Sequence, residues 1–255
     1  MKKKYNLIFL STLLIAVFMF ITPNVHAEEE EKPYFTNSNG VSLTEAEYNY
    51  IKELYSENYL NLITLDVYND LVDNGFMFQP IEKKSTIIND NDSLIPGIST
   101  QGTFFGSSSK GITIAKTCNG NCKIVTTLTW YGVPTVKSYD LMGAYLWGPT
   151  RVSNVITSTS STAQGYSIIE IKEQNKGFGA SFKIPQSGTN FQTIQQFTVT
   201  TGGTVYASYQ HAMKNTTKAI SQMYNITPTG AGYVFAFYGD ATSVYDQMNG
   251  VYIDV

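Results

Sequence analysis

The stretch 112–130, ITIAKTCNGNCKIVTTLTW, indicates the fold more clearly than any other part of the sequence. Its two halves are strand-like runs, and polar and apolar residues alternate from Ile124 to Trp130. Alternation with a period of two is typical of a β-strand that buries one face. The turn former Asn119-Gly120-Asn121 separates the halves, so the stretch predicts two antiparallel strands joined by a tight turn.

The same pattern continues through the rest of residues 100–255. Further alternating runs occur at 169–171, 180–184, 197–199, 205–209 and 233–237. Glycine, asparagine and proline stand between these runs, and short strands at this spacing are typical of an all-β sandwich or barrel. We therefore predict a mostly β fold, in which a short two-helix segment and a linker precede an antiparallel β-sandwich over residues 100–255.

Residues 28–78 predict an acidic helical hairpin. Ser42 and Glu45 have the spacing of a capping box, and apolar residues follow at helical intervals. A second helix starts at Thr64, and Asn74-Gly75 ends it. A pair of helices this short buries little surface by itself, so we expect it to dock on the β domain or on a partner.

Residues 79–99 are polar and predict a linker, since they contain Asn89-Asp90-Asn91-Asp92 and Pro96-Gly97. The Asp/Asn cluster has the residue types of a calcium-binding loop. It lacks the glycine and the distal glutamate that such a loop needs. We therefore expect no metal site in this segment.

The chain beyond the first 27 residues divides into two parts of opposite charge. Residues 28–99 carry 14 acids and 4 bases, a net charge of −10, whereas residues 100–255 carry 6 acids and 10 bases, a net charge of +4. The acidic part repels nucleic acid and anionic lipid. The positive charge of the other part is spread too thinly for a binding footprint, so we expect no nucleic-acid partner.

Residues 1–27 predict a secretory signal peptide. Lys2, Lys3 and Lys4 precede an apolar stretch over 5–21, and Val25-His26-Ala27 suits a signal peptidase. The stretch is marginal in length for a permanent span, and an uncleaved anchor is the alternative. We predict cleavage before Glu28, no stable membrane span after it, and a secreted, extracellular protein that is free or associated with the cell wall.

The two cysteines, Cys118 and Cys122, flank the predicted turn. A disulfide is the default for a cysteine pair in an exported protein. The loop it closes is small, so its effect on chain entropy stabilises the fold by only about 2 kcal/mol. A zinc site needs further Cys or His ligands, and His211 is the only histidine beyond the signal peptide. We predict the disulfide and no metal site.

The chain is poor in side chains that carry catalysis. A hydrolase could use His211 as its base, with Asp140, Asp240 or Asp246 to orient the imidazole. The G-x-S-x-G motif that exposes a nucleophilic serine in many hydrolases is missing. We assign no catalytic residue and no cofactor, and we keep a hydrolase as the second alternative function.

Aromatic side chains with a polar end are abundant in the β domain, and such side chains suit sugar or protein surfaces. Trp147 stands beside Gly148-Pro149 at the end of a strand-like run, so we expect it to be exposed. The candidate binding residues are Trp147, Trp130, Tyr131 and Tyr145; the alternative is that they are core or strand-pair residues. We predict a secreted, non-enzymatic protein that binds an extracellular protein or glycan.

Membrane insertion is the first alternative function. The stretch 152–165 is rich in serine and threonine and is amphipathic. Stretches of this kind can refold as hairpins of an assembled pore in secreted toxins. A surface loop between strands is the competing interpretation of the same residues.

Two blocks of sequence resemble a group of secreted proteins of low-GC Gram-positive bacteria. The first runs from Ile112 to Gly143 and includes both cysteines, Trp130 and Ser138-Tyr139-Asp140. The second is Gly203–Ala212, GTVYASYQHA. The resemblance implies export and a β-rich C-terminal domain. The group has no activity that we can carry over, so the resemblance supplies no catalytic residues.

Overall fold

The computed structural model describes residues 32–88, 110–174, 176–227, 234–246 and 250–255. Strand is the commonest secondary structure of these residues and helix is much rarer, and residues Tyr34–Val255 group into one unit. The predicted signal peptide, residues 1–27, lies outside the described residues, as do residues 89–99 of the predicted linker.

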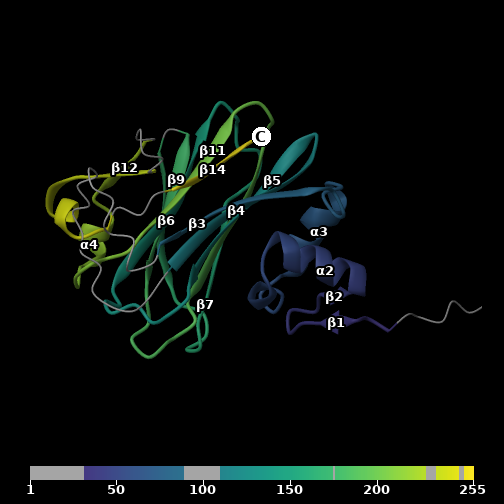
Figure 1. Cartoon of the computed structure of the whole chain (residues 1–255), viewed down its shortest axis with the longest axis horizontal. Coiled ribbons are helices and arrows are strands. Elements are labelled where there is room, and N and C mark those ends of the chain that lie inside the picture. The colour runs from purple at the N-terminus through teal and green to yellow at the C-terminus, as the bar shows by residue number, and fades with distance from the viewer. Residues whose placement is uncertain (1–31, 89–109, 175, 228–233, 247–249) are drawn as a thin grey trace, which may run out of the picture. The chain divides into compact units, whose positions relative to one another are not determined.

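Two five-stranded antiparallel sheets form the centre of this unit (Figure 1). The first sheet has the order β3 (Ile81–Ile88), β4 (Lys110–Asn119), β5 (Asn121–Trp130), β10 (Gln192–Val199), β7 (Ile156–Ser160). The second sheet has the order β14 (Val251–Asp254), β11 (Thr204–Gln210), β6 (Tyr139–Trp147), β9 (Gly177–Lys183), β8 (Ile168–Gln174). Every strand pair in both sheets is antiparallel.

The main hydrophobic core lies between the two sheets. The first sheet contributes Ile112, Ile124 and Phe197, and the second contributes Met142 and Phe178, all of them buried. Residues on one face of a strand recur at every second position, which is why the alternating runs of the sequence fill this layer. The predicted antiparallel β-sandwich is confirmed.

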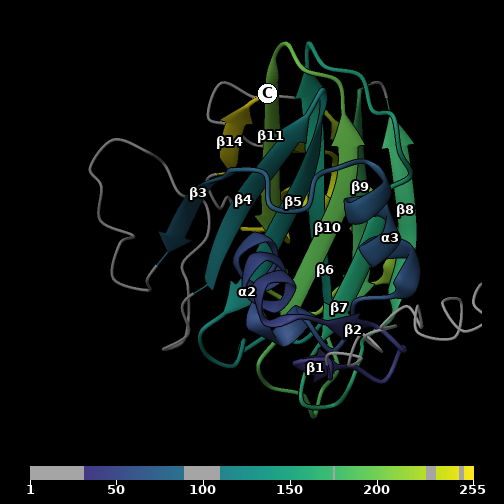
Figure 2. The same cartoon turned by 90° about the vertical axis from the view of Figure 1, so that its right-hand side faces the viewer.

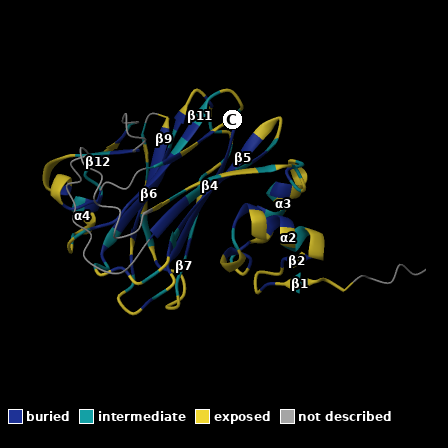
Figure 3. Ribbon diagram, viewed as in Figure 1, coloured by how far each residue is buried: buried dark blue, intermediate teal, exposed yellow. Residues whose placement is uncertain are grey.

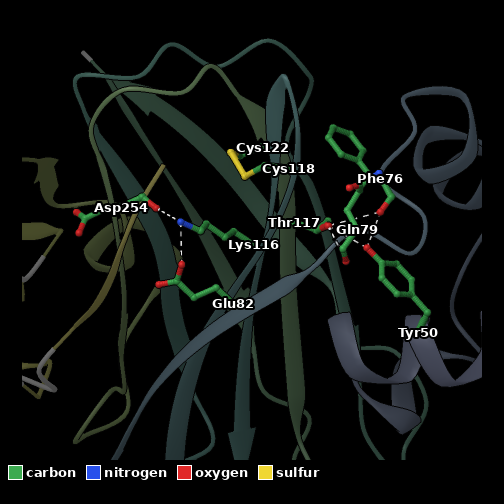
Figure 4. Close-up of a disulfide and its surroundings, with 9 residues drawn as sticks. All are labelled: Tyr50, Phe76, Gln79, Glu82, Lys116, Thr117, Cys118, Cys122 and Asp254. Atoms are coloured by element: carbon green, nitrogen blue, oxygen red, sulfur yellow. Dashed lines mark hydrogen bonds and ion pairs between the residues drawn. A yellow bond between two sulfur atoms is a disulfide. The ribbon is translucent and has the colours of Figure 1, made fainter.

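The hairpin predicted from residues 112–130 is formed by β4 and β5. Cys118 lies directly opposite Cys122, and the two form the predicted disulfide (Figure 4). Gly120 at the turn has φ +73°, a conformation that glycine adopts without steric cost. The bond closes the end of the hairpin and leaves the rest of the sheet to be held by packing.

The helical segment contains β1 (Phe35–Thr36), β2 (Ser42–Leu43), α2 (Glu45–Leu54), η1 (Glu57–Tyr59) and α3 (Leu65–Asp73). The capping box of α2 is formed by Thr44 and Glu47, not by Ser42 and Glu45. Ser42 belongs to β2 instead, so the true cap lies two residues further along. The second helix begins as predicted, with the Thr64 side chain accepting from the Val67 backbone N–H.

The helical segment packs on the face of the first sheet that points away from the second (Figure 2). Ala115, Val125 and Ile194 of the sheet belong to the same buried cluster as the helices. Tyr50 of α2 donates to the Phe76 carbonyl, and its hydroxyl lies 2.9 Å from Thr117 Oγ1 (Figure 4). The β domain is therefore the docking surface that so short a helical pair requires.

The predicted linker is corrected by the structure over part of its length. Residues 81–88 form β3, which pairs with β4 from Ile81 opposite Thr117 onward. Glu82 lies opposite Lys116, and their side chains form an ion pair at 2.9 Å. Charged residues are common on edge strands. Because β3 carries several of them, the sequence pattern did not indicate a strand here.

The outer face of the second sheet is covered by C-terminal elements. They are α4 (Lys218–Ser221), β12 (Tyr224–Ile226), β13 (Phe235–Phe237) and η2 (Gly239–Ser243). Tyr224 and Phe235 pack with Leu141 of β6 in a third buried cluster. Figure 3 shows buried residues along the strands and exposed residues on the outer sides of the helices and on many of the connecting loops.

Across the described ranges, we find no helix that combines the length and the apolar character needed to cross a membrane.

Candidate functional site

A cleft of about 510 Å³ lies at one end of the first sheet. We call it the sheet-end cleft. It is lined by the ends of β5 and β7, the start of β10, the residues that adjoin them, and one residue of η1: Asn58, Thr129, Trp130, Tyr131, Ser160, Ser161, Thr162, Asn190, Phe191 and Gln192. A volume of this size is typical of small-ligand sites.

Strand register brings these residues together. Gln192, the first residue of β10, lies opposite Thr129 of β5 on one side and opposite Ser160 of β7 on the other. Because the three strands are antiparallel neighbours, the residues after β5 and β7 and those before β10 meet at the same end of the sheet. The cleft therefore depends on pairing between segments far apart in the sequence.

Tyr131 supplies the aromatic wall of the cleft and is 60% exposed. Its ring packs over the backbone of Gly111 on the neighbouring strand β4. A Cβ atom at residue 111 would lie only 3.2 Å from Tyr131 Cε2. The absence of a side chain at Gly111 therefore gives the ring its place on the sheet.

Part of the polar lining is held in place by hydrogen bonds. Ser56 donates its hydroxyl to Gln192 Oε1 at 2.9 Å, and Gln192 Nε2 donates to Thr129 Oγ1 at 3.2 Å. The hydroxyls of Thr162 and Thr189 lie 3.0 Å apart. These contacts fix the orientation of donors and acceptors before a ligand arrives, which lowers the entropic cost of binding.

Two amides of the cleft remain available for a ligand. Asn58 and Asn190 are exposed, and their side chains make no hydrogen bond to another residue of the described chain. Asn190 has φ +54°, a conformation that asparagine tolerates better than most residues. Each amide offers both donors and an acceptor.

None of the ten lining residues that the structure describes carries a charge. Its groups are hydroxyls, amides and aromatic rings. Hydroxyls and amides offer donors and acceptors in one place, and an aromatic ring offers a flat apolar face. This combination suits a neutral ligand that is rich in hydroxyl groups and has an apolar face of its own.

The structure separates the four predicted binding residues. Tyr131 lines the cleft and is exposed. Trp130 also borders it, but only 4% of Trp130 is exposed and its Nε1 donates to Tyr209 OH at 3.0 Å. The expectation that Trp130 offers a binding surface is therefore corrected, because its indole is a core group. Trp147 and Tyr145 lie on β6 of the second sheet and are not among the cleft residues.

Trp147 is 61% exposed, and it belongs to an aromatic surface that the sequence alone did not assemble. Tyr206 of β11 lies opposite both Tyr145 and Tyr252, so the three tyrosines form a row across β6, β11 and β14. The rings of Tyr206 and Tyr252 have their centres 5.7 Å apart. Trp147 follows two residues after Tyr145 and therefore points to the same face.

A cluster of charged and polar residues lies in the interior at the end of the sandwich that carries the cleft. Asp140 is fully buried, and its carboxylate accepts hydrogen bonds from Tyr209 OH and from the backbone N–H of Ala212. His211 Nδ1 lies 2.9 Å from Asp140 Oδ2. Burial, followed by the charge of Asp140, raises the pKa of Tyr209 well above its ordinary value.

The second half of this cluster is an ion pair between Lys110 and Asp246, which are 0% and 1% exposed. The backbone N–H of His211 donates to Asp246 Oδ1 at 2.8 Å. The ammonium of Lys110 lies 5.3 Å from the ring centre of Trp130 and 5.2 Å from that of Tyr209. Two carboxylates, one ammonium and one imidazole are thus enclosed by aromatic rings.

The interior cluster shows which aspartate contacts the His211 imidazole. The sequence left Asp140, Asp240 and Asp246 open, and the structure places Asp140 on the imidazole while Asp246 contacts the His211 backbone. Asp240 lies in η2 and is exposed. Within the ranges that the structure describes, the imidazole has hydrogen bonds to Asp140 alone, and no group of three His, Cys, Asp or Glu side chains could hold a metal ion.

Comparison of the chain with known protein families finds no family that matches. A comparison with curated proteins likewise finds no match to this chain.

Proposed function

We propose that this protein is exported and binds a neutral glycan in the sheet-end cleft without altering it. The observation that carries the proposal is the chemistry of the cleft: about 510 Å³, no charged lining residue, and one exposed aromatic ring beside hydroxyls and amides. Sugars present hydroxyls around their edge and C–H groups on one face. The edge needs donors and acceptors together, and the C–H face packs on an aromatic ring.

Two further features support the extracellular part of the proposal. The first 27 residues have the composition of a secretory signal, and a disulfide joins the only two cysteines. Disulfides persist in oxidising compartments outside the cytosol. A glycan on a cell surface, in a cell wall or in the medium is the ligand class that such a protein meets.

The experiment measures binding to neutral oligosaccharides built from glucose, galactose, mannose and N-acetylglucosamine by isothermal titration calorimetry. Tyr131→Ala removes the aromatic wall and is expected to weaken binding at least tenfold, which corresponds to about 1.4 kcal/mol. Tyr34→Ala is the matched control, because Tyr34 is 58% exposed and does not line the cleft. It is expected to bind as the unaltered protein does.

A third variant, Trp147→Ala, distinguishes the cleft from the aromatic surface of the second sheet. Binding that disappears in Trp147→Ala and persists in Tyr131→Ala would overturn the cleft as the binding site. A panel in which no neutral sugar binds would overturn the glycan proposal itself. Binding lost in Tyr131→Ala alone supports it.

Hydrolysis is a second candidate function, and one observation favours it. The contact of His211 Nδ1 with the Asp140 carboxylate is the arrangement by which an aspartate orients a catalytic base. The test is hydrolysis of ester and glycoside substrates by the unaltered protein and by Asp140→Asn. Turnover that is lost in a variant with unchanged thermal unfolding supports this function, and the absence of turnover in the unaltered protein excludes it for those substrates.

A further inference from the structure

Lys110 and Asp246 face each other in the interior with almost no exposure to solvent. Lys110 is the first residue of β4, and Asp246 follows Tyr245, which forms a bridge with Ala212 just after β11. The ammonium donates to Asp246 Oδ2. Removing two opposite charges from water is costly, and this cost can exceed the attraction between them. An interior ion pair therefore has a driving force toward a neutral product.

We propose that Lys110 and Asp246 become joined by an intramolecular amide bond between Lys110 Nζ and Asp246 Cγ. One proton passes from the ammonium to the carboxylate, which leaves a neutral amine and a carboxylic acid. The nitrogen lone pair forms the new bond to Cγ, and the bond from Cγ to Oδ2 breaks. Oδ2 leaves as water with two of the three ammonium hydrogens, and the third stays on the amide nitrogen. The step needs no oxidant, reductant or other reagent.

The contacts of Asp246 match what this step requires. Oδ1 is held by the His211 backbone N–H at 2.8 Å, so a donor already points at the oxygen on which negative charge develops during attack. Oδ2, the oxygen that leaves, is the one that faces the amine. Groups held in this way react as if at very high concentration, because the entropy of bringing them together is lost on folding.

The walls around the pair favour the neutral product. The rings of Trp130 and Tyr209 lie within 5.3 Å of the lysine nitrogen and are themselves buried. Trp130 Nε1 donates to Tyr209 OH, and Tyr209 OH donates to Asp140, so the walls are fixed. Water is thereby kept from both the product amide and the reacting carbonyl.

His211 acts as a positioning residue in this proposal. Its backbone N–H holds Asp246, and its backbone carbonyl accepts from the Asp246 N–H at 3.0 Å. The imidazole is held in turn by Asp140. These hydrogen bonds hold the His211 backbone in place, and the His211 backbone in turn positions Asp246.

The bond would connect residues 136 positions apart in the sequence. It would tie the start of β4 in the first sheet to the segment that lies against the end of β11 in the second. The disulfide, by contrast, spans only 4 positions. The amide would be a long-range covalent restraint of the domain. Such a restraint would stabilise a protein that functions outside the cell, where chaperones do not refold it.

The test is the mass of the intact protein after reduction and denaturation. The mature protein purified from the culture medium, residues 28–255 after the predicted cleavage, is expected to weigh one water molecule less than the sequence of those residues predicts. Lys110→Arg and Asp246→Ala are expected to have the full mass of their sequences. Asp246→Asn is the sharpest variant: the amide it forms is identical and ammonia leaves instead of water, so its final mass is expected to equal that of the unaltered protein.

Peptide mapping distinguishes the cross-link from dehydration elsewhere. Trypsin cannot cut after an acylated Lys110, so residues 85–116 are expected to appear joined to residues 219–255. A loss of water that maps to a single peptide would contradict the proposal. The full sequence mass in the unaltered protein would overturn it, and this result does not depend on whether any variant folds.

Discussion

Gly111 lies against the ring of Tyr131, so that a Cβ atom at residue 111 would stand 3.2 Å from Tyr131 Cε2. The main aromatic wall of the sheet-end cleft is thus placed by a residue without a side chain. Gly111→Ala is expected to shift the ring and to weaken glycan binding roughly fivefold, or about 1 kcal/mol, with the fold intact. Calorimetric titration against the sugar that the unaltered protein binds checks this, together with thermal unfolding. Equal affinity in both proteins would contradict the role of Gly111 in placing the ring.

Tyr55, the residue that caps the C-terminus of α2, donates its hydroxyl to Gln196 Oε1 of β10 at 2.6 Å. Tyr55→Phe removes the hydroxyl and leaves the buried Gln196 Oε1 without this hydrogen-bond donor. We expect the free energy of unfolding to fall by about 1–3 kcal/mol, as measured by urea denaturation. Tyr34→Phe removes a hydroxyl from an exposed ring and is expected to change it by less than about 0.5 kcal/mol. An equal effect of the two changes would contradict the role of Tyr55.

Removal of the Cys118–Cys122 disulfide is expected to have a small effect. The bond closes a loop of 4 positions, and so short a loop restricts the unfolded chain little. Replacement of both cysteines by serine is expected to lower the free energy of unfolding by about 2 kcal/mol and to leave the fold intact. Circular dichroism and urea denaturation of the double variant measure this. Loss of the folded state would show that the hairpin carries far more of the stability than its contacts indicate.

Stability is expected to fall in alkali because of buried tyrosines. Burial raises the pKa of Tyr55, Tyr166 and Tyr209 above the ordinary value, and burial with the Glu47 hydrogen bond raises the pKa of Tyr68 to about 12. The folded state keeps these phenols protonated while the unfolded chain loses their protons above about pH 10. Their contribution is therefore complete below that pH and is lost as the pH rises.

Each of the three buried tyrosines, Tyr55, Tyr166 and Tyr209, lowers the free energy of unfolding by about 1.4 kcal/mol per pH unit above about pH 10. Urea denaturation across a series of alkaline buffers measures the slope. Tyr55→Phe removes one of the titrating phenols. It is expected to make the fall of the free energy of unfolding with pH shallower by about 1.4 kcal/mol per pH unit. A stability that stays constant through this range would contradict the buried, protonated state of these side chains.

Local sequence was enough to predict the features that depend on neighbours along the chain. The turn at Asn119-Gly120-Asn121, the disulfide across it and the helix start at Thr64 follow from residues within a few positions of one another. Local backbone preferences act at that range, and so the mostly β fold and the helical segment were predictable. The capping box was misplaced by two residues because Ser42 is drawn into β2 by pairing with Thr36.

The remaining features depend on contacts between segments that lie far apart in the sequence. Residues 81–88 form a strand because β4 supplies hydrogen-bond partners for their backbone. The local sequence of residues 81–88 does not indicate this pairing. Trp130 turned inward toward Tyr209, and Asp140 came to His211 across two neighbouring strands. The cleft around Tyr131 exists because β5, β10 and β7 end together. These contacts depend on the register between strands. Register is set by the whole sheet, so it cannot be derived from the alternation of residues along a single strand.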